Sequence, residues 1–438
     1  MNYIDFAVAV LMFLVFFSVI LILSTNYFTN ISGLTRTSEF RTVAEGLYNL
    51  FFGGKGIPEN WEKTSLSPVQ IGLIGDLYRV PVIVRETSGY DRINEIVNVN
   101  LIFDSDCKNK SWNNTVRVFD ENNNEVYSKI HNQTFCSSQF LKQARVVWET
   151  NFTANQIKKF YVYFSSDDSI IPSNYSNTFS TVGYWNFDEG SGNMTYDYTG
   201  NNNVGTLENS THGIPQWRSG NDCKYGYCLE FDGEGDYVEV EDSGSLQFRN
   251  ELTVGLWFKM NDKTGYDKKF IDKFYERPFS FTWDVSATSF DFMIRNITDT
   301  RYTSSYNFDP SLGQWYHIAG TYNGSYIQIY FNGMLRDSIY LGGSVTNTTS
   351  SLTIGSGING VNPFNGTIDE VRIWNRALSP EEINASYISG PLPTKLFPEE
   401  KLDTISSTKI EAMKGLNYEE IIKTIGDYRF RIEISERE

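Results

Sequence analysis

The sequence predicts a mainly β protein in four parts: an N-terminal transmembrane helix, a small α/β membrane-proximal base, an antiparallel β-sandwich and a larger β-sandwich. Three observations predict this fold class. Residues 6–23 form an uninterrupted apolar run, residues 80–170 alternate apolar and polar side chains, and glycine-rich strands recur roughly every ten residues over 182–389. The aromatic content of 15% also favours strands over helices.

The first element is the apolar run FAVAVLMFLVFFSVILIL, which is interrupted only by Ser18. Eighteen helical residues rise roughly 27 Å, which is close to the thickness of a bilayer's hydrocarbon core. A cleaved signal peptide is the alternative, but it normally has a basic n-region and a small-residue cleavage site. Here Asp5 precedes the run, and the first five residues contain no Lys or Arg. We therefore expect residues 1–30 to be a retained transmembrane helix.

The membrane-proximal base is predicted from two segments, 31–79 and 392–438. In the first, Phe40, Val43, Leu47 and Leu50 recur at helical spacing before a cluster of Gly and Pro residues. In the second, a helical pattern is followed by DYRFRIEIS, whose alternation predicts a strand.

The small β-sandwich is expected over residues 80–180. Runs such as VPVIVRE, ARVVWET and KKFYVYFSS alternate in the manner of half-buried strands, and turns such as ENNNE separate them.

The larger sandwich is expected over residues 182–389, where GLWFKM and WYHIAGTY are clear strands. Asn332-Gly333 predicts a tight hairpin, and Gly233 and Gly235 predict another turn. Ser379, Pro380 and Glu382 predict the start of a helix. Four tryptophans lie in or beside apolar strands, and we expect them to fill the core: Trp185, Trp257, Trp315 and Trp374.

The net charge limits which classes of partner are plausible, and the cysteines indicate the cellular compartment. A net charge of −16 argues against nucleic acid as a partner, because polyanions require clustered Lys and Arg. The four cysteines suggest two local pairs, Cys107 with Cys136 and Cys223 with Cys228, although three pairings are open. Together with many glycosylation sequons, they favour an extracellular location on a single-pass membrane protein. The sequons after residue 100 begin at Asn109, Asn113, Asn132, Asn151, Asn174, Asn193, Asn209, Asn296, Asn323, Asn347, Asn365 and Asn384.

An ordered set of motifs links residues 182–389 to a known family. GYWNFDEGSG, CLEFDGEGDYVEV, LTVGLWFK, QWYHIAGTYNGSYIQIYFNGML and NGTIDEVRIWNRALSPEEI follow one another in the chain. In this order they resemble the laminin G-like, concanavalin A-like jelly-roll family. The resemblance implies a jelly-roll β-sandwich and, in many members, a structural calcium ion. It places candidate calcium ligands in loops around Asp197, Asp232, Asp236 and Asp369.

The flanking segments resemble archaeal pilin-like or membrane-anchored surface proteins. GIPENW at 56–61, IGL at 71–73 and LNYEEIIKTIGDYRFRIEI at 416–434 carry this resemblance, and Asp5 is similar in position to the acidic fifth residue of mature type IV pilins. This resemblance implies that the two sandwiches are inserted into the base and that the N-terminal helix can mediate homo-oligomerisation.

A catalytic interpretation rests on Glu234, Asp236 and Glu239, which form an E-x-D-x-x-E pattern like that of retaining β-glucanases. Such enzymes need two carboxyl groups about 5–5.5 Å apart. Residues five apart on a strand point to opposite faces, and this motif also spans a turn. We therefore expect surface carboxylates and no enzyme.

The sequence as a whole predicts a membrane-anchored cell-surface protein whose jelly roll binds carbohydrate or another surface protein. A structural role as a pilin-like or surface-layer subunit is the alternative, and a glycoside hydrolase is a third.

Overall fold

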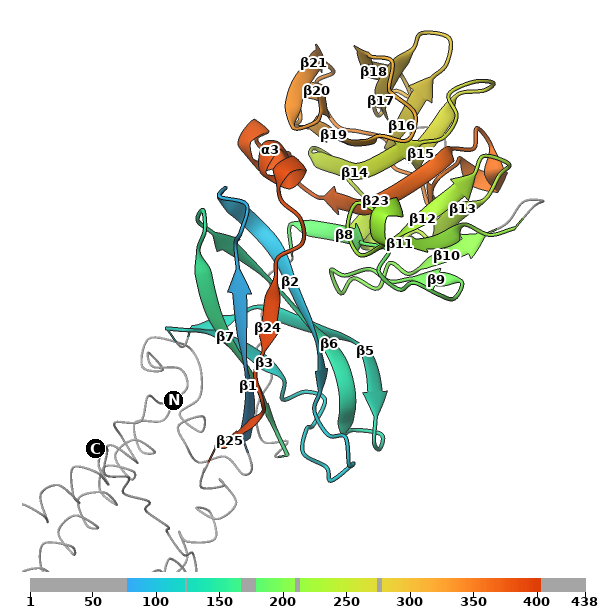
Figure 1. The fold of residues 1–438 in the computed structure, drawn as a ribbon. Coiled ribbons are helices and arrows are strands. Elements are labelled where there is room, and N and C mark those ends of the chain that lie inside the picture. The colour runs from blue at the N-terminus through green and yellow to red at the C-terminus, as the bar shows by residue number, and fades with distance from the viewer. Residues whose placement is uncertain (1–76, 123, 167–178, 209–212, 274–277, 403–438) are drawn as a thin grey trace, which may run out of the picture.

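The computed structural model describes residues 77–402 except residue 123 and segments 167–178, 209–212 and 274–277. These residues fold into two β-sandwiches, which confirms the mainly β prediction (Figure 1). Within this part of the chain, no helix has the length and apolarity needed to cross a membrane. The predicted spanning segment 6–23 and most of the predicted base lie outside the described residues.

The small sandwich packs a six-stranded sheet against a three-stranded one. The six-stranded sheet consists of β24 (Thr394–Leu396), β25 (Glu400–Leu402), β1 (Leu77–Arg85), β7 (Ile157–Ser165), β3 (Arg117–Asp120) and β4 (Glu125–Val126). The three-stranded sheet consists of β2 (Arg92–Ile102), β6 (Leu141–Phe152) and β5 (Ser128–Phe135). Alternate residues of both sheets, among them Val82, Val146 and Trp148, are fully buried between them.

The end of the described chain returns to this sandwich. Both β24 and β25 pair with β1, and Leu402 lies opposite Leu77. This corrects part of the predicted base, because residues 394–402 extend the small sandwich. The first and last described strands therefore leave the molecule side by side, at the end remote from the larger sandwich (Figure 1).

The larger sandwich contains two eight-stranded sheets. The first runs β18 (Arg301–Asn307), β17 (Ser289–Arg295), β16 (Phe279–Asp284), β15 (Lys268–Lys273), β22 (Leu352–Ile354), β13 (Tyr237–Val240), β10 (Gly205–Glu208) and β9 (Met194–Thr195). The second runs β11 (Gln216–Ser219), β12 (Tyr227–Asp232), β23 (Asn365–Trp374), β14 (Leu252–Met260), β19 (Trp315–Tyr322), β20 (Tyr326–Phe331) and β21 (Met334–Tyr340), with β8 (Thr181–Trp185) paired to β23.

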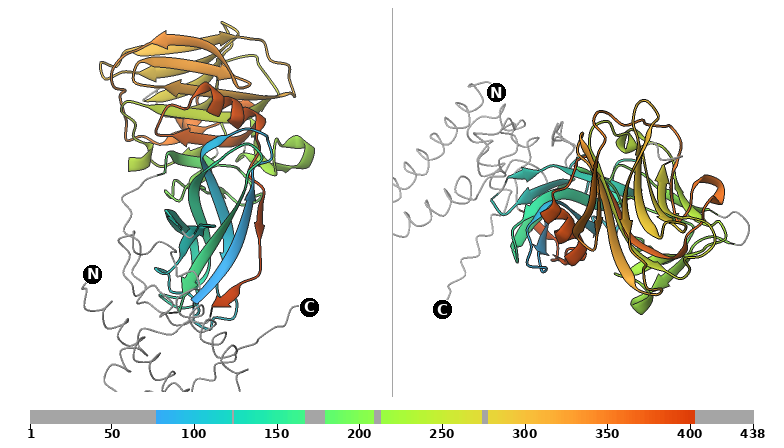
Figure 2. Two further views of the ribbon diagram at one scale, coloured as in Figure 1. Left: turned by 90° about the vertical axis from the view of Figure 1, so that its left-hand side faces the viewer. Right: turned by 90° about the horizontal axis from the view of Figure 1, so that it is seen from above.

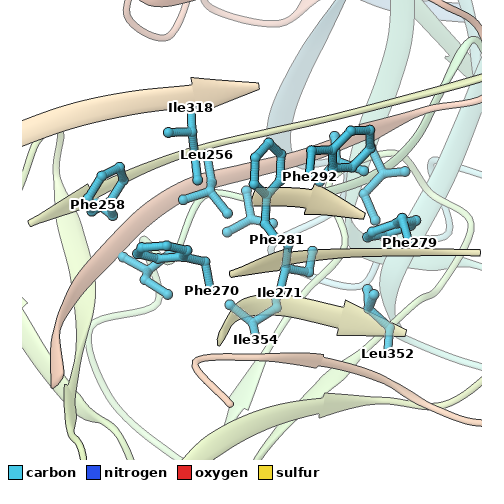
Figure 3. Close-up of a cluster of buried hydrophobic side chains, with 14 of the residues drawn as sticks. Leu256, Phe258, Phe270, Ile271, Phe279, Phe281, Phe292, Ile318, Leu352 and Ile354 are labelled. Atoms are coloured by element: carbon cyan, nitrogen blue, oxygen red, sulfur yellow. The ribbon is translucent and has the colours of Figure 1, made fainter. Parts of the chain in front are cut away.

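A single aromatic-rich core lies between these two sheets (Figure 3). Phe258 from the second sheet meets Phe270 from the first with ring centroids 4.6 Å apart. Phe281 and Phe292 are in similar contact at 4.7 Å. All four rings are fully buried, so the inner faces of the sheets exclude water.

Two local predictions in this domain are confirmed. Asn332 and Gly333 both have positive φ, at 48° and 76°, as a two-residue hairpin turn between β20 and β21 requires. Ser379 caps α3 (Pro380–Ile388), because its hydroxyl accepts from the backbone N–H of Glu382 while the Glu382 carboxylate accepts from that of Ser379.

The two sandwiches are joined by polar contacts as well as by the chain. The chain enters the larger sandwich before β8 and returns after α3, so two connections cross the junction (Figure 2). The crossing contacts include Arg372 with Glu95 at 2.8 Å, Arg92 with the Gly390 carbonyl at 2.9 Å and the Ser180 hydroxyl with Glu149 at 2.7 Å.

Candidate functional site

The outer face of strands β14 and β19 carries aromatic and basic side chains. On β14, Leu256 and Phe258 point into the core, so Trp257 and Lys259 point outward. The register places Lys259 opposite Trp315 and Trp257 opposite His317 on β19. We call these four side chains, Trp257, Lys259, Trp315 and His317, the aromatic face.

Trp257 is the centre of this face. The Nζ atom of Lys224 lies 3.8 Å from the centroid of its ring, which is a close cation–π contact. The ring of Tyr387, on α3, stacks on Trp257 at 5.5 Å, and His317 meets its edge at 5.3 Å. Trp257 is therefore only 4% exposed although it lies outside the core.

A disulfide-closed loop places Lys224 over Trp257. Cys223 and Cys228 are joined, and between them the backbone N–H groups of Lys224 and Tyr225 donate to Oδ2 of Asp369, at 3.1 and 2.9 Å. Asp369 lies on β23 opposite Trp257, so the loop is fixed directly above the sheet. Burial, reinforced by the adjacent Glu370 carboxyl, raises the pKa of Asp369 well above its usual range.

The solvent-accessible edge of the aromatic face is formed by Trp315 and Lys259. Trp315 is partly exposed, and the Nζ atom of Lys259 lies 5.3 Å from its ring centroid. The same Nζ donates to the carbonyl of Asp222 at 2.8 Å, beside the disulfide loop. On β23, Thr367 lies opposite Lys259 but is buried, with 2% of its surface exposed.

Next to this face, Arg372 forms a buried polar cluster at the junction of the two sandwiches. Its guanidinium donates to Glu95 at 2.8 Å, to Glu370 at 3.0 Å and to the Tyr184 hydroxyl at 3.0 Å. Tyr184 in turn donates to Glu370 at 2.8 Å. Glu370 has a φ of 55° beside an irregularity in the pairing of β23 with β14, a conformation that non-glycine residues seldom adopt.

Two small cavities lie beneath α3. One of about 10 Å³ is lined by Trp257, His317, Glu370 and Ser389, and one of about 30 Å³ is lined by residues of β2 and α3. The first has room for about one water molecule. Three of its polar atoms have no hydrogen-bond partner among the described residues: His317 Nδ1, Glu370 Oε1 and Ser389 Oγ. Neither cavity has room for a ring-sized ligand, so only the exposed edge of the face is open to one.

The electrostatics of His317 follow from this burial. The side chain is 2% exposed, and burial together with the positive charges of Arg372 and Lys224 lowers its pKa to about 3. His317 is therefore neutral at physiological pH.

The four predicted calcium ligands do not share one site. Only Asp232 and Asp236 lie together, with the backbone N–H of Asp232 donating to Asp236 Oδ1 at 3.2 Å. Asp197 accepts from the backbone N–H groups of Thr199 and Tyr184, and Asp369 holds the disulfide loop. Across the ranges that the structure describes, no group of three or more His, Cys, Asp or Glu side chains is arranged to hold a metal ion.

The prediction for the tryptophans is only partly right. Trp185 lies in the main core, and Trp374 lies in a smaller cluster with Leu378 and Ile383 below α3. Trp257 and Trp315 do not fill the core. They alternate with Phe258 and Tyr316, which take the inward positions on the same strands.

Both suggested disulfides are present, Cys107–Cys136 and Cys223–Cys228. The residues of the glucanase-like pattern divide between a turn and a strand. Glu234 is exposed in the turn between β12 and β13, and Glu239 lies on β13.

The glycosylation sequons differ in accessibility. Asn347 and Asn365 use their side-chain N–H groups to donate to the carbonyls of Phe248 and Asp232. Asn174 and Asn209 lie outside the described residues, and Asn113, Asn296 and Asn384 are half-buried. The exposed sequon residues are Asn109, Asn132, Asn151, Asn193 and Asn323.

Sequence reasoning missed three charged residues of the site, Lys224, Lys259 and Arg372. The only signal for Lys259 was its place in GLWFKM, where the one charged residue marks the outward parity of the strand. Arg372 likewise points outward, because Val371 and Ile373 on either side of it point into the core. Lys224 gave no signal, because its position depends on the disulfide loop.

Comparison with known proteins supports a jelly-roll domain. Residues 232–384, roughly a third of the chain, match a laminin G-like family model described as the concanavalin A-like lectin/glucanases superfamily. No curated protein matches the chain.

Among solved structures, domain 4 of AbnA, a GH43 extracellular arabinanase from Geobacillus stearothermophilus in complex with arabinotriose, is 22% identical, with a TM-score of 0.38 over 47% of this chain and 97% of that domain. The ligand-binding domain of botulinum neurotoxin serotype D, in complex with N-acetylneuraminic acid, is 15% identical, with a TM-score of 0.39 over 48% of this chain and 50% of that one. The binding domain of Paraclostridial Mosquitocidal Protein 1 is 16% identical, with a TM-score of 0.39, covering 48% and 52%. The chain thus spans about half the length of the two toxin domains.

Proposed function

We propose that the larger sandwich is a carbohydrate-binding module and that the exposed edge of the aromatic face contacts the glycan. The observation that carries this proposal is Trp315, a partly exposed ring on a sheet face whose neighbour in register, Lys259, offers a hydrogen-bond donor. The apolar side of a sugar ring can stack on such an aromatic ring while its hydroxyl groups bond to the polar side chains. The match to a lectin and glucanase superfamily supports the same proposal.

The module would be displayed at a cell surface. The apolar run at residues 6–23 supports a membrane anchor, and two disulfides support an oxidising compartment. The pairing of Leu77 with Leu402 supports one attachment point, because the segments on either side of the sandwiches leave from adjacent strands. The same arrangement favours the second candidate, a structural surface subunit that carries the sandwiches on an assembled base.

Calcium would bind at Asp232 and Asp236. Burial, and then the neighbouring Asp232 carboxylate, raise the pKa of Asp236 to about 8, so a divalent cation would relieve the repulsion between these oxygens. Carboxylate and carbonyl oxygens are the donors that Ca²⁺ prefers, and backbone oxygens would have to complete the set. A calcium-dependent rise in melting temperature that Asp236→Asn abolishes would support this site, and an equal rise in that variant would exclude it.

The binding proposal is tested by screening the full chain, oxidised and in mild detergent, on a glycan array, followed by affinity measurements with Trp315→Ala. We expect saturable binding without product formation and at least a tenfold loss of affinity in the variant. Tyr266→Ala is the matched control, because Tyr266 is 79% exposed in another loop of the same domain. Unchanged affinity in Trp315→Ala would exclude this face, and absence of any glycan binding would favour the structural subunit.

A further inference from the structure

The lysines of the larger sandwich differ in whether their charge is compensated. Residues 182–389 contain six lysines. Four of these form ion pairs with aspartates: Lys263 with Asp309, Lys268 with Asp262 at 3.5 Å, Lys269 with Asp272 at 2.9 Å and Lys273 with Asp242 at 2.5 Å.

The remaining two, Lys224 and Lys259, belong to the candidate site. Neither forms an ion pair with a carboxylate of the described residues. Lys224 faces the ring of Trp257, and Lys259 contacts the ring of Trp315 and the carbonyl of Asp222. In a chain with 53 acidic and 37 basic residues, two neighbouring lysines that form no ion pair with a described carboxylate are unexpected.

These two lysines flank the same loop. Lys259 bonds to Asp222, just before Cys223, and Lys224 follows directly after it. Lys224 is also half-buried, and burial lowers its pKa, an effect that the Asp369 carboxyl offsets only in part. A partly desolvated cation without an ion pair is unfavourable, and an anion that binds beside it reduces that cost.

We infer that the glycan recognised here is acidic, with its carboxylate or sulfate group held between Lys224 and Lys259 and a sugar ring on Trp315. This inference rests on the proposed function and specifies its ligand class. A carboxylate accepts charge-assisted hydrogen bonds from both ammonium groups, whereas a neutral sugar leaves the two charges uncompensated. Recognition would therefore depend on salt concentration as well as on stacking.

The test compares matched pairs of glycans on the full, oxidised chain. Sialylated, uronic acid-containing and sulfated glycans are each paired with their desialylated, carboxyl-reduced or desulfated counterparts. We expect at least tenfold tighter binding to acidic members, and the three classes identify which anionic group is preferred. Equal binding to both members of every pair, with dependence on Trp315, would overturn the inference and leave the proposed function standing. Absence of all binding would overturn both.

Variants locate the preference on the two lysines. Lys224→Met with Lys259→Met keeps the aliphatic stems and removes both charges, and should abolish the tenfold preference for acidic over neutral glycans, with the remaining, weaker binding still dependent on Trp315. Lys259→Arg should retain it. Lys263→Met is the matched control, because Lys263 already pairs with Asp309. The melting temperature of each variant shows that it is folded, and an unchanged preference in the folded double variant would contradict the inference.

Discussion

The two faces of strand β14 are buried to a similar degree but differ in chemistry. On the inner face, Phe258 is fully buried among apolar side chains. On the outer face, Trp257 is almost as buried, but its neighbours are Lys224, His317 and Tyr387. Two buried polar atoms beside it, His317 Nδ1 and Glu370 Oε1, have no hydrogen-bond partner in the part of the chain that the structure describes. Burial alone therefore does not distinguish the two faces. The inner face stabilises the fold by excluding water, whereas the outer face buries Trp257 against a lysine, a histidine and a tyrosine.

The largest expected effect is on the inner face. Phe258→Ala should lower the free energy of unfolding by about 4 kcal/mol, because the substitution opens a cavity in a close-packed core. Its neighbour Lys259→Ala, on the outer face, should cost less than about 1 kcal/mol. Chemical denaturation measures both, and equal losses would contradict the distinction between the faces.

A smaller loss is expected at the junction. Arg372→Met should cost about 3 kcal/mol, because it leaves the buried Glu370 carboxylate without its cation and removes one of the two arginines that pair with the half-buried Glu95. The exposed Arg301, on β18, gives the control Arg301→Met, for which we expect a change below about 0.5 kcal/mol. Similar stability in both variants would show that the junction contributes little.

The disulfide loop should contribute less again. Removing the bridge in Cys223→Ser/Cys228→Ser should cost about 2 kcal/mol on the loop-closure model, because the two cysteines are five residues apart. The variant should also weaken glycan binding, since the loop positions Lys224. The Cys107→Ser/Cys136→Ser variant, in the other sandwich, should lose stability without losing binding. Loss of binding in both would point to a general effect on folding.

The smallest expected effect is a dependence of stability on pH that arises from His317, on the outer face. The unfolded chain protonates a histidine near its ordinary pKa of 6.5, whereas folded His317 resists protonation down to about pH 3. Its contribution to stability is therefore complete above pH 6.5 and is lost as the pH falls, by about 1 kcal/mol between pH 7.5 and 5.5. His317→Gln should remove this part of the pH dependence in denaturation measurements. An identical pH profile in variant and wild type would show that His317 does not respond to this range.

Local signals in the sequence predicted much of the fold. Alternation located the strands, Asn332-Gly333 located a hairpin, and Ser379 located a helix start, because each depends on residues close in the chain. The pairing of β25 with β1 was not predictable in this way, since Arg79 and Glu400 are 321 residues apart.

The candidate site was less predictable than the fold. In GLWFKM every residue before Lys259 is apolar or glycine, so Lys259 is the single sign of which side faces outward, and the pattern does not show that Trp257 meets Lys224 there. The contact between Arg372 and Glu95 joins two domains and depends on how they dock. The disulfide pairs were suggested by position, but the role of the loop that one of them closes was not.

The return of the chain to β1 has a mechanical consequence. If the larger sandwich is held by a ligand and the base by a membrane, tension enters the small sandwich at Leu77 and Leu402, on neighbouring strands. The segment from α3 through β24 and β25 to Leu402 joins the larger sandwich to this attachment point covalently, so a pull at Leu402 travels along the chain itself. Because hydrogen bonds between strands lie perpendicular to the strand direction, the same pull loads the pairs of β24 and β25 with β1 in shear instead of unzipping them one bond at a time.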